Sequence, residues 1–382
     1  MSRRPNRVRA SRAVGLLALM AACTPGFRPP GHEGPAGAVE TWVVARDASV
    51  GAGVTAPTAP ALAVSAHGAG HAVLEVPPLA ETRIAATLVG PIATIERTKV
   101  YTTPAATTDG FITFTPPHAP ARQDYLVRLG RRTLAILVRE PAEARALAGS
   151  EAHASLVTAT ADGQVVIPAG PLPGRAAELT VETVGLVPWH DGAYELTVPR
   201  VPEGDVAFTA DVYGPGPIVV VNSPSHAIDA APDSIEHLHV ALREPRTLCD
   251  DDFVLRYRID PADRPGAIVV QTDGAEQVVA LVVHPLEVGH EPVAASDVTI
   301  DWNGIPVTEV RPAKIGRVSA GAPLVVLARA AGAITGPIVV RARVGRETRT
   351  LTLARSDAVP ATGLRALPSL WARASGAAAP RR

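Results

Sequence analysis

Two neighbouring side chains have the chemistry of a nucleophile and its base. Ser225 and His226 place a hydroxyl beside an imidazole in one predicted loop, and Asp229 follows. A catalytic base normally reaches the nucleophile from a separate element and is oriented by a third group, so sequence neighbours seldom form a triad. We therefore interpret this loop as a turn and expect no enzyme activity. The alternative is a periplasmic hydrolase or metal-dependent enzyme that uses Ser225, His226, His237 and Asp251.

Histidines and carboxylates also offer metal ligands. His237 and His239 form a His-x-His pair on a predicted strand, where alternate side chains share one face, and such a pair is half of a zinc site. The run Asp250–Asp252 offers hard oxygen ligands of the kind that Ca²⁺ takes, but adjacent residues of an extended chain point in different directions. No motif spacing marks a third ligand, so we expect no metal and no cofactor. The alternative metal ligands are His237, His239 and Asp251.

The element after these acids is a predicted strand, which makes the acids its polar entry turn. Alternate side chains of a strand lie on opposite faces, and large apolar residues recur here at every second position. The sequence therefore predicts one buried face formed by Phe253, Leu255 and Tyr257, and an opposite face formed by Val254, Arg256 and Arg258.

Composition narrows both the fold and the partners. The 382 residues contain 36 basic and 37 acidic side chains, so charge offers no attraction for nucleic acid. Hydrophobic residues make up 47% of the chain, which is enough for two or three cores. Short runs rich in Val, Ile, Thr and Leu, separated by Gly or Pro, predict a mainly β protein built of sandwiches. The exception is Pro141–His153, whose Ala and Glu content predicts a helix.

The N-terminus has the pattern of an export signal. Arginines precede the short apolar run Val14–Ala22, and residues 20–23 read Met-Ala-Ala-Cys, which resembles a bacterial lipobox. This resemblance implies cleavage of residues 1–23 as a lipoprotein signal peptide, a lipid on Cys23, and localisation at the cell envelope, in the outer membrane. Simple secretion is the alternative. The Pro- and Gly-rich residues 24–62 are expected to form a disordered tether, with a short strand at Val39–Ala45.

Five blocks in sequence order resemble one known family. The first, Leu79–Thr103, is similar to the opening of a VIT domain, the module of inter-alpha-trypsin inhibitor heavy chains and vault proteins. The resemblance implies a VIT-type β-sandwich with one short helix over residues 63–202. The other four blocks are Tyr125–Arg145, Gly192–Arg200, Asn222–Ile228 and Asp251–Tyr257.

Bacterial proteins of this kind carry a von Willebrand A domain next, with a metal site on an Asp-x-Ser-x-Ser loop, but this chain lacks it. The resemblance resumes after a junction at about residues 285–296. Because an inserted domain leaves and re-enters its host at neighbouring points, a short connection can replace it at small loop-closure cost. We therefore expect Val206–Leu286 and Val298–Leu353 to pair within a second β-sandwich of residues 203–355. A disordered tail of residues 356–382 is expected to follow, in which Leu370–Arg373 resembles the start of the family's later helix.

The resemblance implies a function through binding. We expect a non-enzymatic, lipid-anchored envelope protein whose VIT-type module acts as a scaffold through protein–protein contacts. The expected partner is another envelope protein. The most specific form of this prediction is a partner that carries an A domain. The membrane is expected to be contacted through the N-terminal lipid. A vestigial relic of a VIT and A-domain ancestor is a further alternative.

Overall fold

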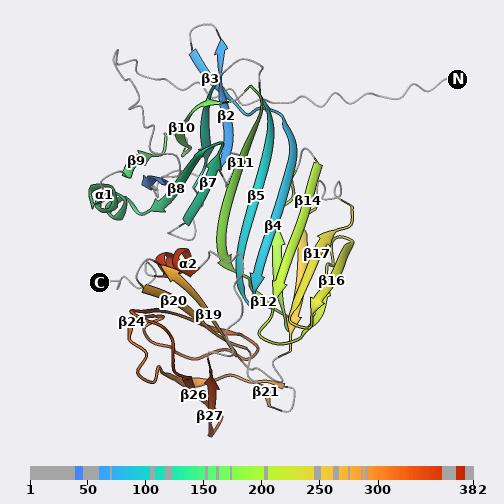
Figure 1. Cartoon of the computed structure of the whole chain (residues 1–382), viewed down its shortest axis with the longest axis vertical. Coiled ribbons are helices and arrows are strands. Elements are labelled where there is room, and N and C mark those ends of the chain that lie inside the picture. Colours follow the sequence, from blue (N-terminus) through green and yellow to red (C-terminus); the bar gives the residue numbers. More distant parts are fainter. Residues whose placement is uncertain are drawn as a thin grey trace, which may run out of the picture.

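The fold is known from a computed structural model. It describes residues 39–45, 60–68, 71–103, 108–116, 123–150, 154–160, 163–172, 174–201, 205–244, 251–260, 266–273, 276–284, 287–288, 291–354 and 367–374. Within these ranges the protein is mainly β, as the sequence predicts, and its strands form one large sheet with several smaller ones around it (Figure 1). No described helix is long and apolar enough to cross a membrane.

A ten-stranded sheet is the framework of the molecule. Most neighbouring strands are antiparallel, but β14 runs parallel to β4, and β1 runs parallel to both β8 and β9. In spatial order the strands are β16 (Ile228–Ser234), β17 (His237–Leu242), β14 (Asp205–Tyr213), β4 (Leu79–Val89), β5 (Ile92–Thr103), β11 (Arg175–Leu186), β7 (Gln123–Leu129), β8 (Arg132–Arg139), β1 (Val39–Ala45) and β9 (Ala154–Thr158).

Two four-stranded sheets pack on this framework. The first has the order β10 (Val165–Leu172), β6 (Thr108–Phe114), β2 (Ala61–Gly68) and β3 (His71–Glu75). The second has the order β12 (Trp189–His190), β13 (Ala193–Val198), β18 (Phe253–Ile259) and β15 (Ile218–Asn222). The core under the first contains Tyr101, and the core under the second contains Ala93. Because these residues stand an even number of positions apart on β5, both small sheets cover the same face of the large sheet.

A further sandwich follows at the C-terminal end of the chain. One sheet has the order β19 (Gly266–Asp273), β20 (Glu276–Val283), β25 (Leu324–Ala330) and β24 (Val307–Arg311), and the facing sheet has the order β23 (Ser296–Asp301), β26 (Ile338–Val344) and β27 (Glu347–Leu353). A short hairpin, β21 (Glu287–Val288) and β22 (Glu291–Pro292), precedes β23. Strand β20 is buried on both faces. One set of alternate residues faces the core of the C-terminal sandwich, and the other set faces the ends of β4, β5 and β11 in the large sheet.

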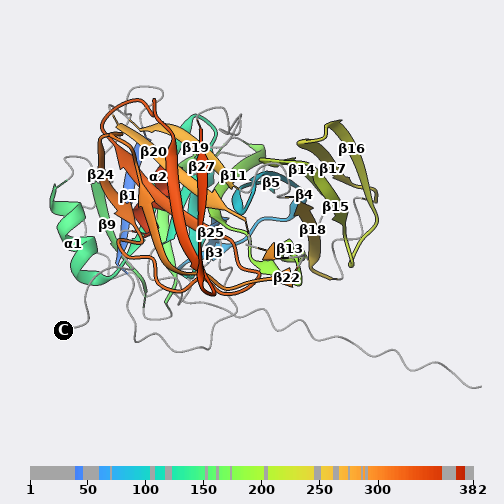
Figure 2. The same cartoon turned by 90° about the horizontal axis from the view of Figure 1, so that it is seen from below.

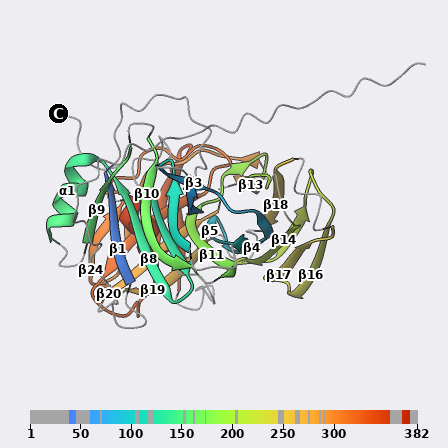
Figure 3. The ribbon, with the colours of Figure 1, turned by 90° about the horizontal axis from the view of Figure 1, so that it is seen from above.

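Two helices close exposed parts of the sheets. Helix α1 (Pro141–Ser150) packs Ala144 against Val43 and Ala45 of β1, at the opposite end of the ten-stranded sheet from β16 and β17 (Figure 3). Helix α2 (Leu367–Ala374) buries Leu367, Leu370 and Trp371 against β19 and β20 (Figure 2). The helix predicted at residues 141–153 is therefore present over its first ten residues.

Several sequence expectations are confirmed, and others differ. In β18 the side chains of Phe253, Leu255 and Tyr257 are buried, as alternation predicts. The strand expected at Val39–Ala45 is present as β1. It belongs to the ten-stranded sheet and buries Val43 and Val44 completely, so this part of residues 24–62 is not a tether. In the expected tail of residues 356–382, helix α2 includes Leu370–Arg373, where the sequence resembles a helix start, and this part of the tail is therefore ordered. The remaining parts of the predicted signal peptide, tether and tail lie outside the described residues, apart from the end of the tether in β2.

The sheets also cross the domain boundary that we expected at residue 202. Strand β14 pairs with β4, and β18 pairs with β13, so residues up to Ile259 complete sheets begun before the boundary. The C-terminal sandwich starts only at β19. Pairing across the junction at residues 285–296 is present, because β20 pairs with β25 along its whole length. The physical reason for the difference is burial: Val206, Phe208 and Val212 of β14 need the core beside β4.

Candidate functional site

The Ser225–His226 loop is tied into the fold by its hydroxyls. Ser225 Oγ accepts a hydrogen bond of 2.9 Å from the Val254 amide, and it lies 2.8 Å from His226 Nδ1. Ser223 Oγ accepts a hydrogen bond of 3.1 Å from the His226 amide. The Asp229 carboxylate, which the sequence offered as a third member, is held instead by Arg243 at 2.8 Å. This arrangement joins the loop to the start of β18, as a structural turn would.

The histidines of β17 share one carboxylate, consistent with their predicted common face. Asp211 Oδ1 lies 3.3 Å from His237 Nε2 and 3.1 Å from His239 Nδ1. The other ring nitrogen of His237 lies 3.1 Å from Asp233, and its ring stacks on Tyr213 at 4.2 Å. In the described part of the chain, no group of three or more His, Cys, Asp or Glu side chains is arranged to hold a metal.

The set of residues proposed for the hydrolase alternative does not come together. Ser225 and His226 precede Ile228, which pairs with Leu242 at one end of the β16–β17 hairpin, whereas His237 pairs with Ser234 at the other end. Six residues of strand separate the two ends by roughly 20 Å. Asp251 is an exposed residue near the start of β18, on the side of the Ser225 loop. Cys23 and Asp250 lie outside the described residues.

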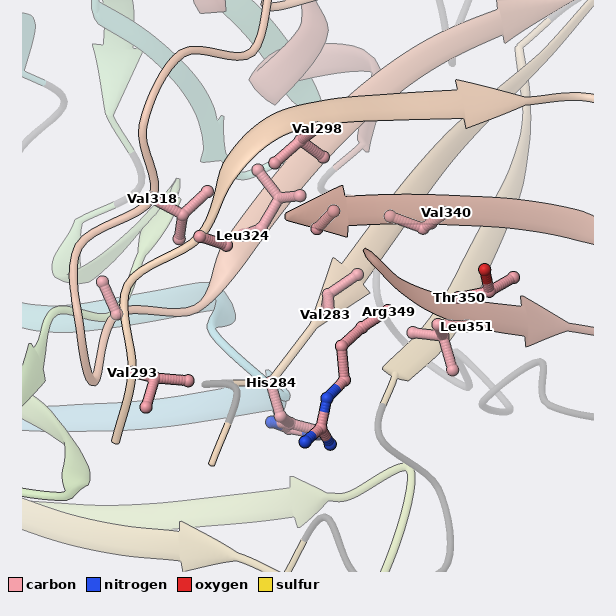
Figure 4. Close-up of a pocket in the computed structure, with 13 residues that line it drawn as sticks. Val283, His284, Val293, Val298, Val318, Leu324, Val340, Arg349, Thr350 and Leu351 are labelled. Atoms are coloured by element: carbon pink, nitrogen blue, oxygen red, sulfur yellow. The ribbon is translucent and has the colours of Figure 1, made fainter. Parts of the chain in front are cut away.

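A cavity of about 210 Å³ lies inside the C-terminal sandwich (Figure 4). Its walls are mostly apolar, with Val298, Val318 and Leu324 at one side and His284 and Arg349 at another. His284 is almost fully buried, and burial lowers its pKa to about 4. Its Nδ1 lies 3.4 Å from the Tyr194 hydroxyl, while its Nε2 has no partner within the described structure.

A larger cavity, of about 490 Å³, lies between the two small sheets that cover the ten-stranded sheet. We call it the inter-sheet groove; β5, β11 and β13 line it, with apolar side chains such as Ile95, Val181 and Leu196. Two cations on β5, Arg97 and Lys99, also line it. They are two residues apart on a strand and therefore point to the same side.

These two cations lack compensation. In the described part of the chain neither side chain has an ion pair or a hydrogen bond, and Arg97 Nε is buried without a partner. Burial lowers the pKa of Arg97. Burial, and then the neighbouring charge of Arg97, lowers the pKa of Lys99 to about 8. Burial is the largest cause of both shifts, because the charged forms lose water and gain no anion.

Sequence reasoning missed the groove, although a signal was present. The alternating composition of Ile92–Thr102 predicts a strand, but alternation alone does not show which of its faces other sheets cover. Arg97 and Lys99 continue the series of Ala93 and Ile95, which packs inward. Lysine is also rare in this chain: the only two are Lys99 and Lys314, while arginine is used everywhere else.

An exposed apolar patch surrounds the edge strand β15, which pairs only with β18 in its sheet. Val219 and Val220 are 45% and 38% exposed, and both stand at a bulge in that pairing. Ile235, in the turn between β16 and β17, is 71% exposed, and its carbonyl accepts a hydrogen bond from the Ile218 amide. We call Val219, Val220 and Ile235 the β15 patch.

Comparisons with known proteins do not assign this architecture. No protein-family model matches the chain, and no curated protein matches it significantly.

Proposed function

We propose that this protein is a non-enzymatic binding module of the cell envelope, anchored by a lipid on Cys23, that recognises a partner protein through the β15 patch. The observation that carries the proposal is the exposure of Val219, Val220 and Ile235 together at a sheet edge. A cluster of exposed apolar side chains is costly in water unless a partner covers it. Edge strands also offer backbone groups to a strand of another protein.

Two further observations support binding rather than catalysis. Ser225 uses its hydroxyl to hold β18, and Asp229 is paired with Arg243, so the loop has an evident structural role. Five sequence blocks resemble VIT proteins, and this resemblance implies a function through protein–protein contacts. It therefore also supports binding rather than catalysis. The partner is an envelope protein, and one that carries an A domain is the sharpest candidate.

Site-specific photocrosslinking in the native envelope tests the proposal. A photoreactive residue at Val220 is expected to give one discrete adduct with one protein. The matched control is Leu156 on β9, another edge strand, because it is 44% exposed and Val220 is 38% exposed. Adducts of equal yield and pattern at both positions, or none at Val220, would contradict the proposal.

The membrane anchor is tested separately. A Cys23→Ala variant is expected to leave the membrane fraction, because a thiol is required for acylation. Mass analysis of the mature N-terminus gives the lipid directly. Retention of the variant in the membrane fraction, or an unmodified mature N-terminus, would show that the protein is secreted or held in another way.

A further inference from the structure

The inter-sheet groove contains an unusual electrostatic arrangement. Arg97 and Lys99 stand roughly 7 Å apart along one strand, with their charged ends in the same cavity. Like charges at this separation repel each other, and burial strengthens the repulsion. A buried charge is normally paired, because desolvation without a counter-charge is costly. In the described residues neither charge is paired.

The other titratable groups that line the groove do not supply the missing charge. Glu195 of β13 pairs with Arg256 at 3.5 Å. Tyr125 of β7 is a neutral phenol in its ordinary form, and its ring packs edge-on against Phe114. The lowered pKa of Lys99 is caused by burial and by Arg97, with no opposing contribution from a carboxylate.

The shape and the walls of the groove complete the argument. Its volume of about 490 Å³ is in the range of small-molecule sites. Apolar residues from three strands line it, including Ile95, Val181 and Leu196. An occupant that suits both the walls and the cations has an acid group at one end and an apolar body at the other.

We propose that the inter-sheet groove binds a small organic anion, a carboxylate with an apolar body, whose acid group lies between Arg97 and Lys99. The bound carboxylate neutralises the two cations, and its apolar body covers the walls formed by β11 and β13. The site is separate from the β15 patch and does not depend on the partner proposed there.

Calorimetric titration of the purified full chain tests this proposal with octanoate as the probe. We expect one octanoate per chain, and binding at least about tenfold weaker for octanol, octylammonium and acetate, each of which lacks one of the two features. Inorganic phosphate is titrated in the same way, as an anion without an apolar body. Tighter binding of phosphate than of octanoate would assign the cations to an inorganic anion and overturn the proposal, as would equal binding of octanol.

Substitutions locate the probe. Lys99→Met and Arg97→Met are each expected to weaken octanoate binding by at least about tenfold, since a charged hydrogen bond is lost. Lys314→Met is the matched control, because Lys314 is the other lysine of the chain and is exposed on a different sandwich. Unchanged binding in both groove variants, or equal loss in Lys314→Met, would place the probe elsewhere.

A measurement on the unsubstituted protein tests the proposal even if the substituted proteins fail to fold. The two lysines are distinguished by NMR after isotopic methylation of their amines. Octanoate is expected to raise the pKa of Lys99 above about 8 and to leave Lys314 unaffected. Because the anion needs the charged amine, its affinity is expected to fall about tenfold between pH 7 and pH 9. A Lys99 pKa that does not respond to octanoate would overturn the proposal.

Discussion

The Ser225–His226 loop and the inter-sheet groove differ in how their polar groups are satisfied. The loop presents side chains of catalytic type on the surface, and its hydroxyls bond to the backbone of the same fold. The groove presents two ordinary cations that are partly buried, and it supplies no anion to them within the described structure. The comparison teaches that the type of a residue is a weaker guide to a binding site than an unmet electrostatic requirement.

The largest expected effect tests how strongly the loop belongs to the scaffold. Phe253 is fully buried beneath it, packing on Phe208 at 4.3 Å and near His226 at 5.7 Å. Phe253→Ala should lower the free energy of unfolding by about 3–5 kcal/mol, because a buried ring leaves a cavity. Chemical denaturation measures the change. A loss below about 1 kcal/mol would mean that the loop and β18 are not part of one core.

A second prediction concerns another buried and incompletely paired group, His284. Its pKa is about 4 in the folded protein and near 6.5 when unfolded, so the unfolded chain binds the extra proton between these values. Stability should therefore fall as the pH drops from 6.5 to 4, by roughly 3 kcal/mol from this group. His284→Gln should remove that part of the pH dependence, whereas His190→Gln, at an exposed position, should not. Parallel curves for wild type and His284→Gln would contradict the prediction.

The third prediction has the opposite sign and bears most directly on the comparison. Lys99→Met should raise the free energy of unfolding at pH 7 by about 1–2 kcal/mol, because it removes a partly buried charge that has no counter-charge in the described structure. The penalty exists while Lys99 is charged, so it should fade as the pH rises from its folded pKa of about 8 towards 10.5. Denaturation at pH 7 and at pH 10 measures both effects. Destabilisation by Lys99→Met at pH 7 would show that Lys99 has a structural partner.

The smallest effect is expected at the loop hydroxyl. Ser225→Ala should destabilise the fold by about 0.5–1 kcal/mol, because the exposed Val254 amide loses its acceptor. Ser223→Ala, which removes the bond to the His226 amide, is the neighbouring control. An esterase and peptidase screen of the same variants completes the test. Turnover in wild type that disappears in Ser225→Ala would assign a catalytic role to the loop and reverse the comparison.

The local sequence pattern was sufficient to predict structure where a single rule, such as strand alternation, decided it. Alternation placed Phe253, Leu255 and Tyr257 on the buried face of β18, and the Ala- and Glu-rich segment after Pro141 formed α1. The structural interpretation of Ser225 followed from the distance that a catalytic base normally has to bridge, and the contacts of its hydroxyl agree with it. Pairing across residues 285–296 was also predicted, on the expectation that these residues replace an inserted domain whose ends would lie close together, and β20 does pair with β25.

Long-range pairing was decided by the tertiary structure. The sequence determined that this chain forms short strands with apolar and polar faces, but a face is defined as interior only by what packs on it. Parallel pairing brings β14 beside β4 and inserts β1 between β8 and β9, which moved the boundaries that we expected. The same packing turns Arg97 and Lys99 from residues of an ordinary strand into the cations of a groove, because two separate sheets cover the surface on either side of them.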